Sequence, residues 1–356
     1  MPAPTARFPT LTSAQAEFTG GRGYLAACTV GLPTRGVRAA VIADLDAAAQ
    51  GRPDPIAYTA AVEKSRDHFA TLVGVASDRV AIGSQASVAA ALVAASLPPR
   101  AEVLIADGDF SSIVLPFVHS GRDLRVRTAP VGRLAESVRA ETAMVVFSLV
   151  QSATGEVADA EAIVSAAAEH GARTFCDATQ AVGWLPVEAS RFDAVVCHAY
   201  KWLCAPRGVS FLTVSPRLQG DMPALFAGWY AGSDPWVSCY GGGVTLAPDA
   251  TRFDVSPAWQ AFVGAEPALA LFASLDSHEL HAHATGLARR FREGLGLDAP
   301  PRESAIVTWA DAEGADLARL IDAGIVASGR AGRARVAFHL FNDEHDVELA
   351  LAALGR

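Results

Sequence analysis

Two apolar stretches that end in polar residues decide how this chain folds. The first reads Phe-Cys-Asp-Ala-Thr-Gln-Ala-Val-Gly over residues 175–183, and the second reads Phe-Asp-Ala-Val-Val-Cys-His-Ala-Tyr-Lys-Trp-Leu-Cys-Ala-Pro-Arg-Gly over residues 192–208. Each predicts a buried strand, one closed by Asp177 and the other followed by Lys201. Ligands of parallel sheets collect at the carboxyl ends of the strands, so these polar residues mark a candidate site.

Strand-like and helix-like runs alternate along the first two-thirds of the chain. Helical patterns occupy residues 86–96, where small residues share one face, and residues 159–170. Helices that alternate with unbroken apolar strands are typical of a mostly parallel sheet covered on both faces. The predicted strands are residues 79–82, 102–106, 124–128, 144–149, 173–176, 194–197 and 208–214.

The pattern changes after about Thr251. A long helical pattern at 258–297 is followed by shorter runs at 304–309, 312–323, 324–328 and 334–338, and by a closing helix from Asp343. We interpret this part as a second, smaller α+β domain. The large domain would then comprise residues 21–255, and the small domain residues 1–20 and 256–356.

Composition excludes several classes of protein. Of the 356 residues 51% are apolar and 19% charged, so the chain can bury a large core and is not disordered. A formal charge of −9 argues against nucleic-acid binding, which needs clustered basic residues. No apolar run reaches the roughly 18–20 residues of a membrane span, and residues 1–9 lack the apolar core of a signal peptide. Five scattered cysteines predict neither a disulfide nor a zinc framework, so we expect a cytoplasmic protein.

Lys201 and Asp177 are the candidate catalytic residues. Lys201 directly follows an apolar strand, beside Trp202 and a Pro-Arg-Gly turn, where water is excluded. Desolvation lowers the pKa of a lysine and makes its neutral, nucleophilic amine accessible. Asp177, on a neighbouring strand end, can hold a protonated ring nitrogen, and together the two meet the requirements of pyridoxal 5'-phosphate. The alternative is that Asp177 caps a turn and Lys201 is a solvated loop residue.

Two motifs carry a resemblance to a known family. Asp-Ala-Thr-Gln (177–180) and His-Ala-Tyr-Lys-Trp-Leu (198–203) resemble motifs of the class V aminotransferases, fold-type-I pyridoxal-phosphate enzymes that include cysteine desulfurases, kynureninases and carbon–sulfur lyases. The resemblance implies the PLP-dependent transferase fold of type I, an α/β fold with a mostly parallel mixed sheet flanked by helices and a smaller α+β domain. It also implies that Lys201 binds the cofactor covalently, that Asp177 pairs with its pyridine nitrogen and that Gln180 hydrogen-bonds its phenolate oxygen.

The resemblance also supplies candidates for binding the cofactor's phosphate. Ser84, Gln85 and Ala86 lie between a predicted strand and a predicted helix, where unpaired backbone N–H groups favour an anion. His198 and Tyr200 resemble the family's phosphate-binding pair. Without the resemblance, His198 is equally a core histidine and Tyr200 an aromatic residue at the rim.

Other segments resemble those that hold the cofactor ring and the substrate. Phe110 stands where the family places the ring that stacks on the cofactor, and Gln151 stands where many relatives carry an asparagine near the ring oxygen. Arg335, in Arg-Val-Ala-Phe-His-Leu-Phe-Asn (335–342), would grip the α-carboxylate of an amino-acid substrate in a bidentate pair. Ala27 lies in the N-terminal segment on which substrate specificity would depend.

A further match concerns a second subunit. Arg-Phe-Asp-Val-Ser-Pro (252–257) resembles a stretch whose hydroxyl reaches the partner subunit's phosphate. Ser256 would supply that hydroxyl, which implies a homodimer with shared active sites. The aromatic residues Trp229, Tyr230 and Trp236 either line a substrate pocket or belong to the dimer interface, and the sequence leaves both readings open.

The sequence predicts no metal site and no nucleotide-phosphate loop. His278, Glu279, His281 and His283 are close in sequence, but on a helix the three histidines do not share one face, so we expect a solvated surface. Neither a Gly-x-x-x-x-Gly-Lys loop nor a Gly-x-Ser-x-Gly elbow is present.

The lack of a cysteine in one segment narrows the set of reactions that the chain could catalyse. Cysteine desulfurases attack the substrate's sulfur with a cysteine that precedes the arginine strand, and residues 324–335 contain none. The chain most resembles the ergothioneine-type carbon–sulfur lyases of actinobacteria, which implies β-elimination from an S-substituted cysteine. Decarboxylation coupled to oxidative deamination, or transamination, of the same substrate stays open. A catalytically silent binding scaffold is the third reading, which the presence of Lys201 and Asp177 disfavours.

Overall fold

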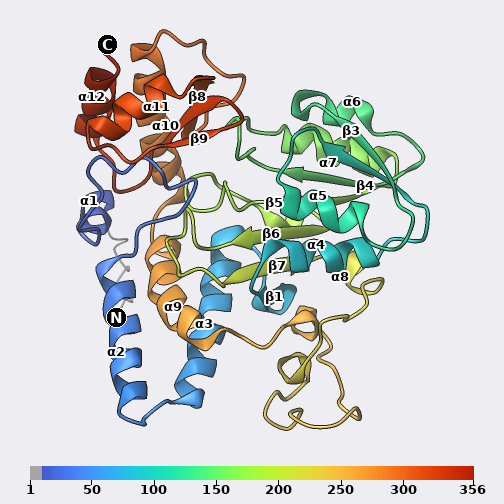
Figure 1. Cartoon of the computed structure of the whole chain (residues 1–356). Helices are drawn as coiled ribbons and strands as arrows, with labels where there is room; N and C mark the ends of the chain where they lie inside the picture. Colours follow the sequence, from blue (N-terminus) through green and yellow to red (C-terminus); the bar gives the residue numbers. More distant parts are fainter. Residues whose placement is uncertain (1–9) are drawn as a thin grey trace, which may run out of the picture.

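A seven-stranded sheet forms the centre of the computed structural model, which describes residues 10–356 (Figure 1). In spatial order its strands are β1 (Val80–Gly83), β7 (Ser210–Val214), β6 (Ala194–His198), β5 (Arg173–Asp177), β4 (Thr142–Ser148), β2 (Glu102–Ala106) and β3 (Arg125–Ala129). The pairs from β6 to β3 are parallel, whereas β7 is antiparallel to both β1 and β6. The predicted fold is therefore confirmed, and each strand begins within two residues of its predicted start.

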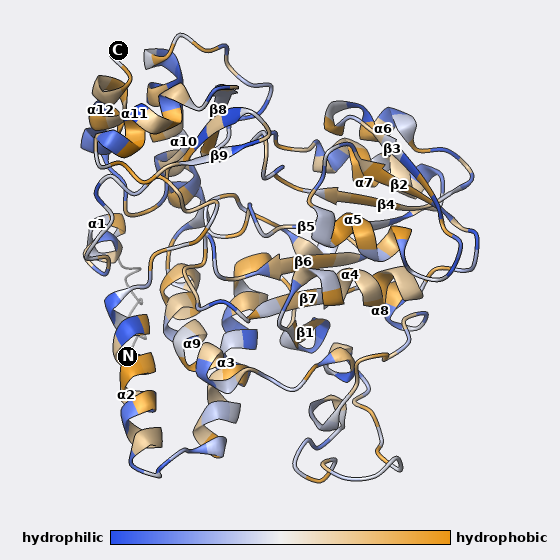
Figure 2. Cartoon of the chain, in the orientation of Figure 1, coloured by the Kyte–Doolittle hydropathy of each residue, from blue (hydrophilic) through white to orange (hydrophobic). Residues whose placement is uncertain are grey.

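Both faces of this sheet are buried, because alternate side chains of each strand enter different hydrophobic clusters. In β4, Val145 and Phe147 pack in one cluster, and Met144 and Val146 pack in the other. Figure 2 shows these central strands as predominantly hydrophobic. The first cluster includes residues of α2 (Arg35–Ala49), α3 (Pro55–Val73), α6 (Leu134–Ser137), α7 (Ala160–Glu169) and α9 (Trp259–Ala273). The second includes residues of α4 (Ala86–Ala95), α5 (Ser111–Val118) and α8 (Pro216–Gln219).

The C-terminal part contains a second, three-stranded antiparallel sheet. Its spatial order is β8 (Ile306–Ala310), β10 (Arg333–Ala337) and β9 (Ser328–Arg330). Three helices share its hydrophobic cluster, namely α10 (Ser277–Gly294), α11 (Ala315–Asp322) and α12 (Glu344–Ala353). The short helix α1 (Leu11–Gln15) also reaches this part, because Gln15 donates to the carbonyl of Leu340 at 3.1 Å.

The chain after α1 connects the two sheets. Tyr24 pairs with Val326 and Ala26 pairs with Ala337 through isolated bridges to the small-sheet region. The same segment then turns at residues 26–30 and runs toward the large sheet, where the N–H of Gly31 donates to the carbonyl of Tyr200 at 2.9 Å. Residues 26–31 therefore lie between the two parts of the molecule.

The long helix predicted at 258–297 is wrong, because two helices occupy this range. The first, α9, ends at Ala273, and α10 begins at Ser277. Asp276 separates them, since its side chain accepts the N–H groups of His278 and Glu279 and so caps α10. The break lets α9 pack against α2 and α3 while α10 packs against α12. The division into two domains at residue 256 stays a prediction.

Residues 220–249 form an irregular segment with one short 3₁₀ turn, the gold coil at the bottom of Figure 1. It exposes several apolar side chains, among them Trp236, Val237 and Tyr240. Within residues 10–356 no helix has both the length and the apolar character needed to cross a membrane. The prediction that residues 1–9 lack a signal sequence lies outside the described residues.

Candidate active site

Lys201 occupies a buried turn directly after β6. Its side chain is only 6% exposed, and among the described residues it has no hydrogen-bond or ion-pair partner. Burial lowers the pKa of Lys201, and the negative charge of Asp177 opposes this shift. Its Nζ lies 5.4 Å from the ring centroid of Phe110 and 5.6 Å from that of Tyr200. The amine is therefore held in an apolar surrounding, where its neutral form is favoured.

Asp177 ends the neighbouring strand β5, which pairs in parallel with β6. Its Oδ1 accepts the N–H of Thr179 at 2.8 Å, and burial raises the pKa of its carboxyl. Thr179 also ties the two strand ends together, since its hydroxyl accepts the N–H of His198 at 3.0 Å. The predicted pair of acid and amine thus meets at the carboxyl edge of the sheet, as the alternation of strands indicated.

The turn that carries Lys201 is enclosed by backbone. A Cβ added to Gly31 would lie 2.0 Å from the carbonyl oxygen of Lys201, and one added to Gly183, whose φ is +113°, would lie 2.6 Å from that of Trp202. Glycine is required at both positions because the chain passes too close for any side chain. Nε2 of His339 donates to the carbonyl of Trp202 at 2.9 Å, which fixes the turn from behind.

Cys204 lies in the same turn, with a left-handed backbone at φ +55°. Its Sγ lies 3.7 Å from the carbonyl oxygen of Lys201 and 3.8 Å from Nε2 of His339. Burial raises its pKa, so the group is a neutral thiol. Cys204 therefore packs against the back of the lysine turn.

His198 contains a buried nitrogen that no described residue satisfies. Its Nε2 has no hydrogen-bond partner, and its ring meets that of Tyr200 edge-on at 4.4 Å between centroids. Burial lowers the pKa of His198 to about 4, so the ring is neutral near pH 7. An unpaired buried nitrogen costs free energy unless a ligand completes it, and a phosphate oxygen fits this requirement.

The predicted phosphate turn lies at the N-terminus of α4. Gln85 is the N-cap residue, its side chain makes no capping hydrogen bond, and Ala86 is the first helical residue. The leading N–H groups of the helix are thereby left for an anion at its positive end. Ser84 directly follows Gly83 at the end of β1, so the strand aims the turn at this edge of the sheet. Together with His198, these residues fit the phosphate of pyridoxal 5'-phosphate.

Phe110 stands at the start of α5, half exposed, with its ring near Lys201. Asp109 positions it, because the Asp109 carboxylate accepts the N–H of Phe110 and that of Ser148, each at 2.7 Å. The second carboxylate contact fastens the segment to the end of β4. Stacking of Phe110 on the cofactor ring stays a prediction that this placement favours.

The two side-chain amides that were predicted to contact the cofactor ring donate to protein groups in this structure. Nε2 of Gln180 donates to the carbonyl of Cys28 at 2.8 Å and to the hydroxyl of Ser152 at 3.1 Å. Nε2 of Gln151 donates to the carbonyl of Asp107 at 2.7 Å. Hydrogen bonds from Gln180 and Gln151 to the ring oxygen therefore stay predictions, and they need these amides to exchange partners.

Arg335 extends from β10 to the large-domain site and is only 1% exposed. Its guanidinium donates to the hydroxyls of Thr29 at 2.9 Å, Ser328 at 3.1 Å and Ser152 at 3.1 Å, and also to the carbonyl of Ser152. Burial lowers the pKa of Arg335. Binding of a substrate carboxylate by Arg335 stays a prediction, and it needs the carboxylate to replace some of these neutral acceptors.

Three predicted residues lie at the margins of the site. Ala27 is fully buried in the segment between the two parts of the molecule. Ser256 is exposed, and its hydroxyl accepts the indole N–H of Trp229 at 3.2 Å. The chain before it is anchored by Asp254, whose carboxylate accepts the N–H of Ile82 in β1. Contact of Ser256 with a partner subunit stays a prediction.

Sequence reasoning missed the roles of Thr29, Ser152, Thr179 and Ser328, and it marked Cys28 only as part of the segment on which substrate specificity would depend. Thr179 lies within the motif at 177–180 and Ser152 follows Gln151, but only tertiary structure brings these residues to Gln180, His198 and Arg335. Position within or beside a motif was the only signal that the sequence contained for them.

The histidines of α10 are not the solvated surface that the sequence predicted. His278 is exposed, but His281 is half-buried and stacks on Trp184 at 5.7 Å between centroids. His283 is also half-buried, and its Nε2 donates to the carbonyl of Asn342 at 3.0 Å. In the described part of the chain no group of three or more potential metal ligands occurs.

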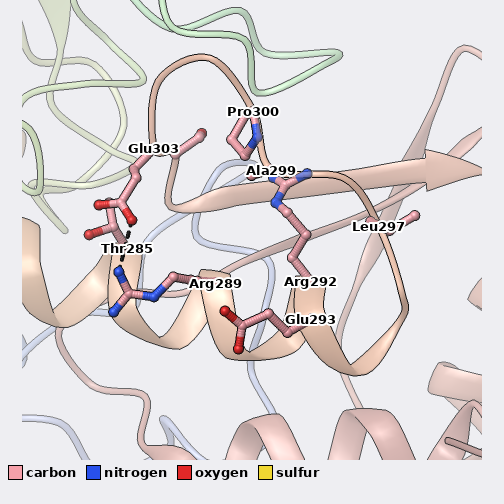
Figure 3. A pocket seen from close by; sticks show the side chains of 9 residues that line it. Thr285, Arg289, Arg292, Glu293, Leu297, Ala299, Pro300 and Glu303 are labelled. Atoms are coloured by element: carbon pink, nitrogen blue, oxygen red, sulfur yellow. Dashed lines mark hydrogen bonds and ion pairs between the residues drawn. The ribbon is translucent and has the colours of Figure 1, made fainter.

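A separate pocket lies at the C-terminal end of α10 (Figure 3). Arg289 reaches across it to Glu303, with Nη1 3.0 Å from Oε1, while Arg292 lies further along the same helix. None of its lining residues belongs to the site around Lys201.

Comparisons with known proteins identify the family of this chain. The family model described as aminotransferase class-V matches residues 55–310. An uncharacterized aminotransferase, YcbU of Bacillus subtilis, is 25% identical over 315 residues, which cover 82% of this chain and 83% of that protein. A kynureninase of Deinococcus radiodurans is 28% identical over 63% of this chain and 56% of its own length. The structure of the cystine C-S lyase C-DES with its product cysteine persulfide superimposes with a TM-score of 0.84, at 19% identity, over 94% of this chain and 97% of that one. With a family match over well more than half of its length, this chain belongs to the class-V aminotransferases and is a pyridoxal-phosphate-dependent enzyme.

Proposed function

We propose that this enzyme is a carbon–sulfur lyase that catalyses β-elimination from an S-substituted cysteine. The products would be a thiol or thione, pyruvate and ammonia. The observation that supports this most directly is Lys201, a buried amine with no hydrogen-bond partner within residues 10–356, near the charges of Asp177 and Arg335. This arrangement provides one base for the Cα proton and one cation for the α-carboxylate.

The cofactor supplies an electron sink for the carbanion at Cα. Lys201 would hold the cofactor covalently, and its amine, once free, would accept the Cα proton of the substrate. Asp177 would pair with the ring nitrogen, because its carboxylate lies at the neighbouring strand end. His198, Tyr200 and the turn at residues 84–86 would hold the phosphate, for which His198 offers its unpaired Nε2.

Arg335 would orient the substrate through its α-carboxylate, beside Ala27. Its present acceptors are hydroxyls and a carbonyl, which are neutral, so an anionic carboxylate competes favourably for the guanidinium. The hydroxyls of Ser152 and Thr29 are then released to the substrate or to water.

A homodimer with shared sites belongs to this proposal. Ser256 is exposed at the end of an anchored segment, where a partner subunit can reach it. The outer face of α2 exposes Ile42 and Leu45, and the irregular segment exposes Trp236 and Tyr240. Exposed apolar side chains on separate elements are typical of surfaces that a second subunit covers.

Two observations support a sulfur-containing substrate: the description of one structural relative, and the lack of a cysteine in residues 324–335. The relative is described as a cystine C-S lyase, and the likeness to it concerns the fold. Residues 324–335 contain no cysteine, which disfavours desulfuration through a cysteine at that place. Within this reaction class we place the chain in the ergothioneine-type lyase branch.

Product analysis with the purified, cofactor-loaded protein tests the proposal. A panel of cysteine S-conjugates is expected to give pyruvate, ammonia and free thiol in equal amounts. Release of carbon dioxide with an aldehyde would instead indicate decarboxylative oxidation, and stoichiometric consumption of an oxo acid would indicate transamination. Either result would replace β-elimination as the function.

A further inference from the structure

Residues 26–31 close the space between the lysine turn and Arg335. At one end the N–H of Gly31 donates to the carbonyl of Tyr200 at 2.9 Å. Two residues earlier the hydroxyl of Thr29 accepts Nη2 of Arg335, also at 2.9 Å. This short segment therefore touches both groups that would flank a bound amino acid.

Cys28 lies within that segment. Its carbonyl accepts Nε2 of Gln180 at 2.8 Å, and its side chain is a free thiol that is 1% exposed. The next residue, Thr29, accepts Nη2 of Arg335, and the Cys28 side chain is among the groups that raise the pKa of Arg335 and of Lys201. Cys28 is thus the thiol that lies beside both the proposed base and the proposed carboxylate clamp.

A second feature shows that a ligand belongs at this place. Lys201 is more than nine-tenths buried and has no hydrogen-bond or ion-pair partner among the described residues. A buried amine in this state needs a bound group to complete it. The ligand that reaches Lys201 and Arg335 together passes next to Cys28.

Resting on the proposed function, we propose that Cys28 is the acid that protonates the sulfur atom as it leaves the substrate. Lys201 takes the Cα proton, the Cβ–S bond breaks, and its electron pair goes to sulfur. The sulfur takes the proton of the Cys28 thiol. The Cys28 thiolate then takes the proton that Lys201 acquired, so both side chains return to their starting states without an external oxidant or reductant.

The first test varies the leaving group. General acid assistance matters most when the departing thiolate is strongly basic and least when it is already stable. Cys28→Ala is therefore expected to lower kcat about 100-fold for an S-alkyl cysteine, and by less than about threefold for an S-(4-nitrophenyl) cysteine. Cys28→Ser, which keeps an O–H donor, should fall between. An equal loss on both substrates would mean that Cys28 is only structural, and no loss on either would also overturn the proposal.

Cys239→Ser is the matched control, because this free cysteine lies in the irregular segment and its thiol donates to the carbonyl of Pro235 at 3.6 Å. It should leave both rates unchanged. A KM that stays constant in Cys28→Ala while kcat falls would place the effect on the chemical step rather than on substrate binding.

The second test needs no turnover. The probe is the methanethiosulfonate of cysteine, in which the sulfur carries a methylsulfonyl group. In Lys201→Ala, the Cys28 thiolate should attack that sulfur, forming a disulfide and releasing methanesulfinate, and peptide mass spectrometry should find the added cysteine on Cys28. We expect this probe to label Cys28 more than tenfold faster than methyl methanethiosulfonate, and Arg335→Gln to remove the preference.

The two tests separate the inference from the function on which it rests. Capture at Cys28 without turnover of any S-conjugate would reject the lyase but retain Cys28 as a thiol facing the substrate. Turnover without dependence on Cys28 would retain the lyase and reject the acid. Labelling confined to Cys239 would overturn the placement of Cys28 itself.

Discussion

The turn at residues 198–205 and the irregular segment at residues 220–249 are built in opposite ways. In the turn, seven of eight side chains are buried, and glycines at 31 and 183 let the surrounding backbone pass within contact distance. In the irregular segment Tyr240 is 93% exposed, and a Cβ added to Gly241, Gly242 or Gly243 would meet nothing within 4 Å. We attribute this difference in packing to the different roles that we propose for the two regions.

The contrast shows where rigidity is needed. A base must be held within a fraction of an ångström of the proton that it takes, so the lysine turn is confined from every side. A surface that another molecule completes need not be packed beforehand. The comparison predicts that small changes in the turn are costly and that large changes in the irregular segment are tolerated by the isolated fold.

The largest effect is expected from removing the amine. Lys201→Ala should abolish turnover while the fold and noncovalent cofactor binding persist, because the cavity it leaves is small and lies in an already rigid turn. The chain has only two lysines, Lys201 and the exposed Lys64, so the covalent link is simple to assign. Borohydride reduction of the loaded protein followed by peptide mass spectrometry should find the pyridoxyl group on Lys201 and not on Lys64.

Lys64→Ala is the control, with full activity and full cofactor absorbance expected. Retained turnover in Lys201→Ala, or a pyridoxyl group on Lys64, would show that the site has been placed wrongly.

A single added methyl group should have the next largest effect. Gly31→Ala places a Cβ against the backbone carbonyl of Lys201, which cannot move as a flexible side chain would. We expect a loss of about 1–3 kcal/mol in the free energy of unfolding and more than about tenfold in kcat, since the turn must shift. Denaturant titration and steady-state kinetics measure the two losses. Gly220→Ala, where nothing lies within 4 Å, should change neither; similar losses in both variants would contradict the confined turn.

The sequence predicts the residues of the lysine turn better than it predicts the segments that pack around this turn. Asp177 and Lys201 could be found because each follows a continuous apolar strand, a local pattern that tertiary structure preserved. For Cys28 the sequence indicated only a segment that would affect substrate specificity, since its contact with Gln180 spans 152 residues and depends on how the N-terminal segment crosses between the sheets. The break between α9 and α10 was missed for a different reason. Asp276 carries a local signal for the start of a helix, since its side chain caps α10, but the apolar pattern on both sides of Ser-Leu-Asp at 274–276 was interpreted as one helix.

A pH titration tests how burial and the charge of Asp177 set the pKa of Lys201 in the rigid turn. Burial lowers the pKa of Lys201 and the charge of Asp177 raises it, so the carboxylate stabilises the ammonium form. Removing that charge in Asp177→Asn should therefore lower the pKa further and make the neutral amine available at lower pH. Competitive acetylation of the cofactor-free protein, read by peptide mass spectrometry, should give a midpoint for Lys201 below the ordinary lysine value and lower again in Asp177→Asn. Exposed Lys64 serves as the internal reference, and an upward shift in the variant would contradict the assigned charge interaction.

The smallest effect on the isolated fold is expected in the irregular segment. Tyr240→Ser removes a side chain that is almost entirely in water, so the free energy of unfolding should change by less than about 0.5 kcal/mol. If the segment is covered by a second subunit, the same change should weaken dimerisation measurably in sedimentation equilibrium. Ile321→Ser, on the exposed side of α11, is the matched control and should leave association unchanged. A large loss of folding stability in Tyr240→Ser would mean that the segment is packed as firmly as the lysine turn. Unchanged association would instead favour the alternative that its aromatic residues line a substrate pocket.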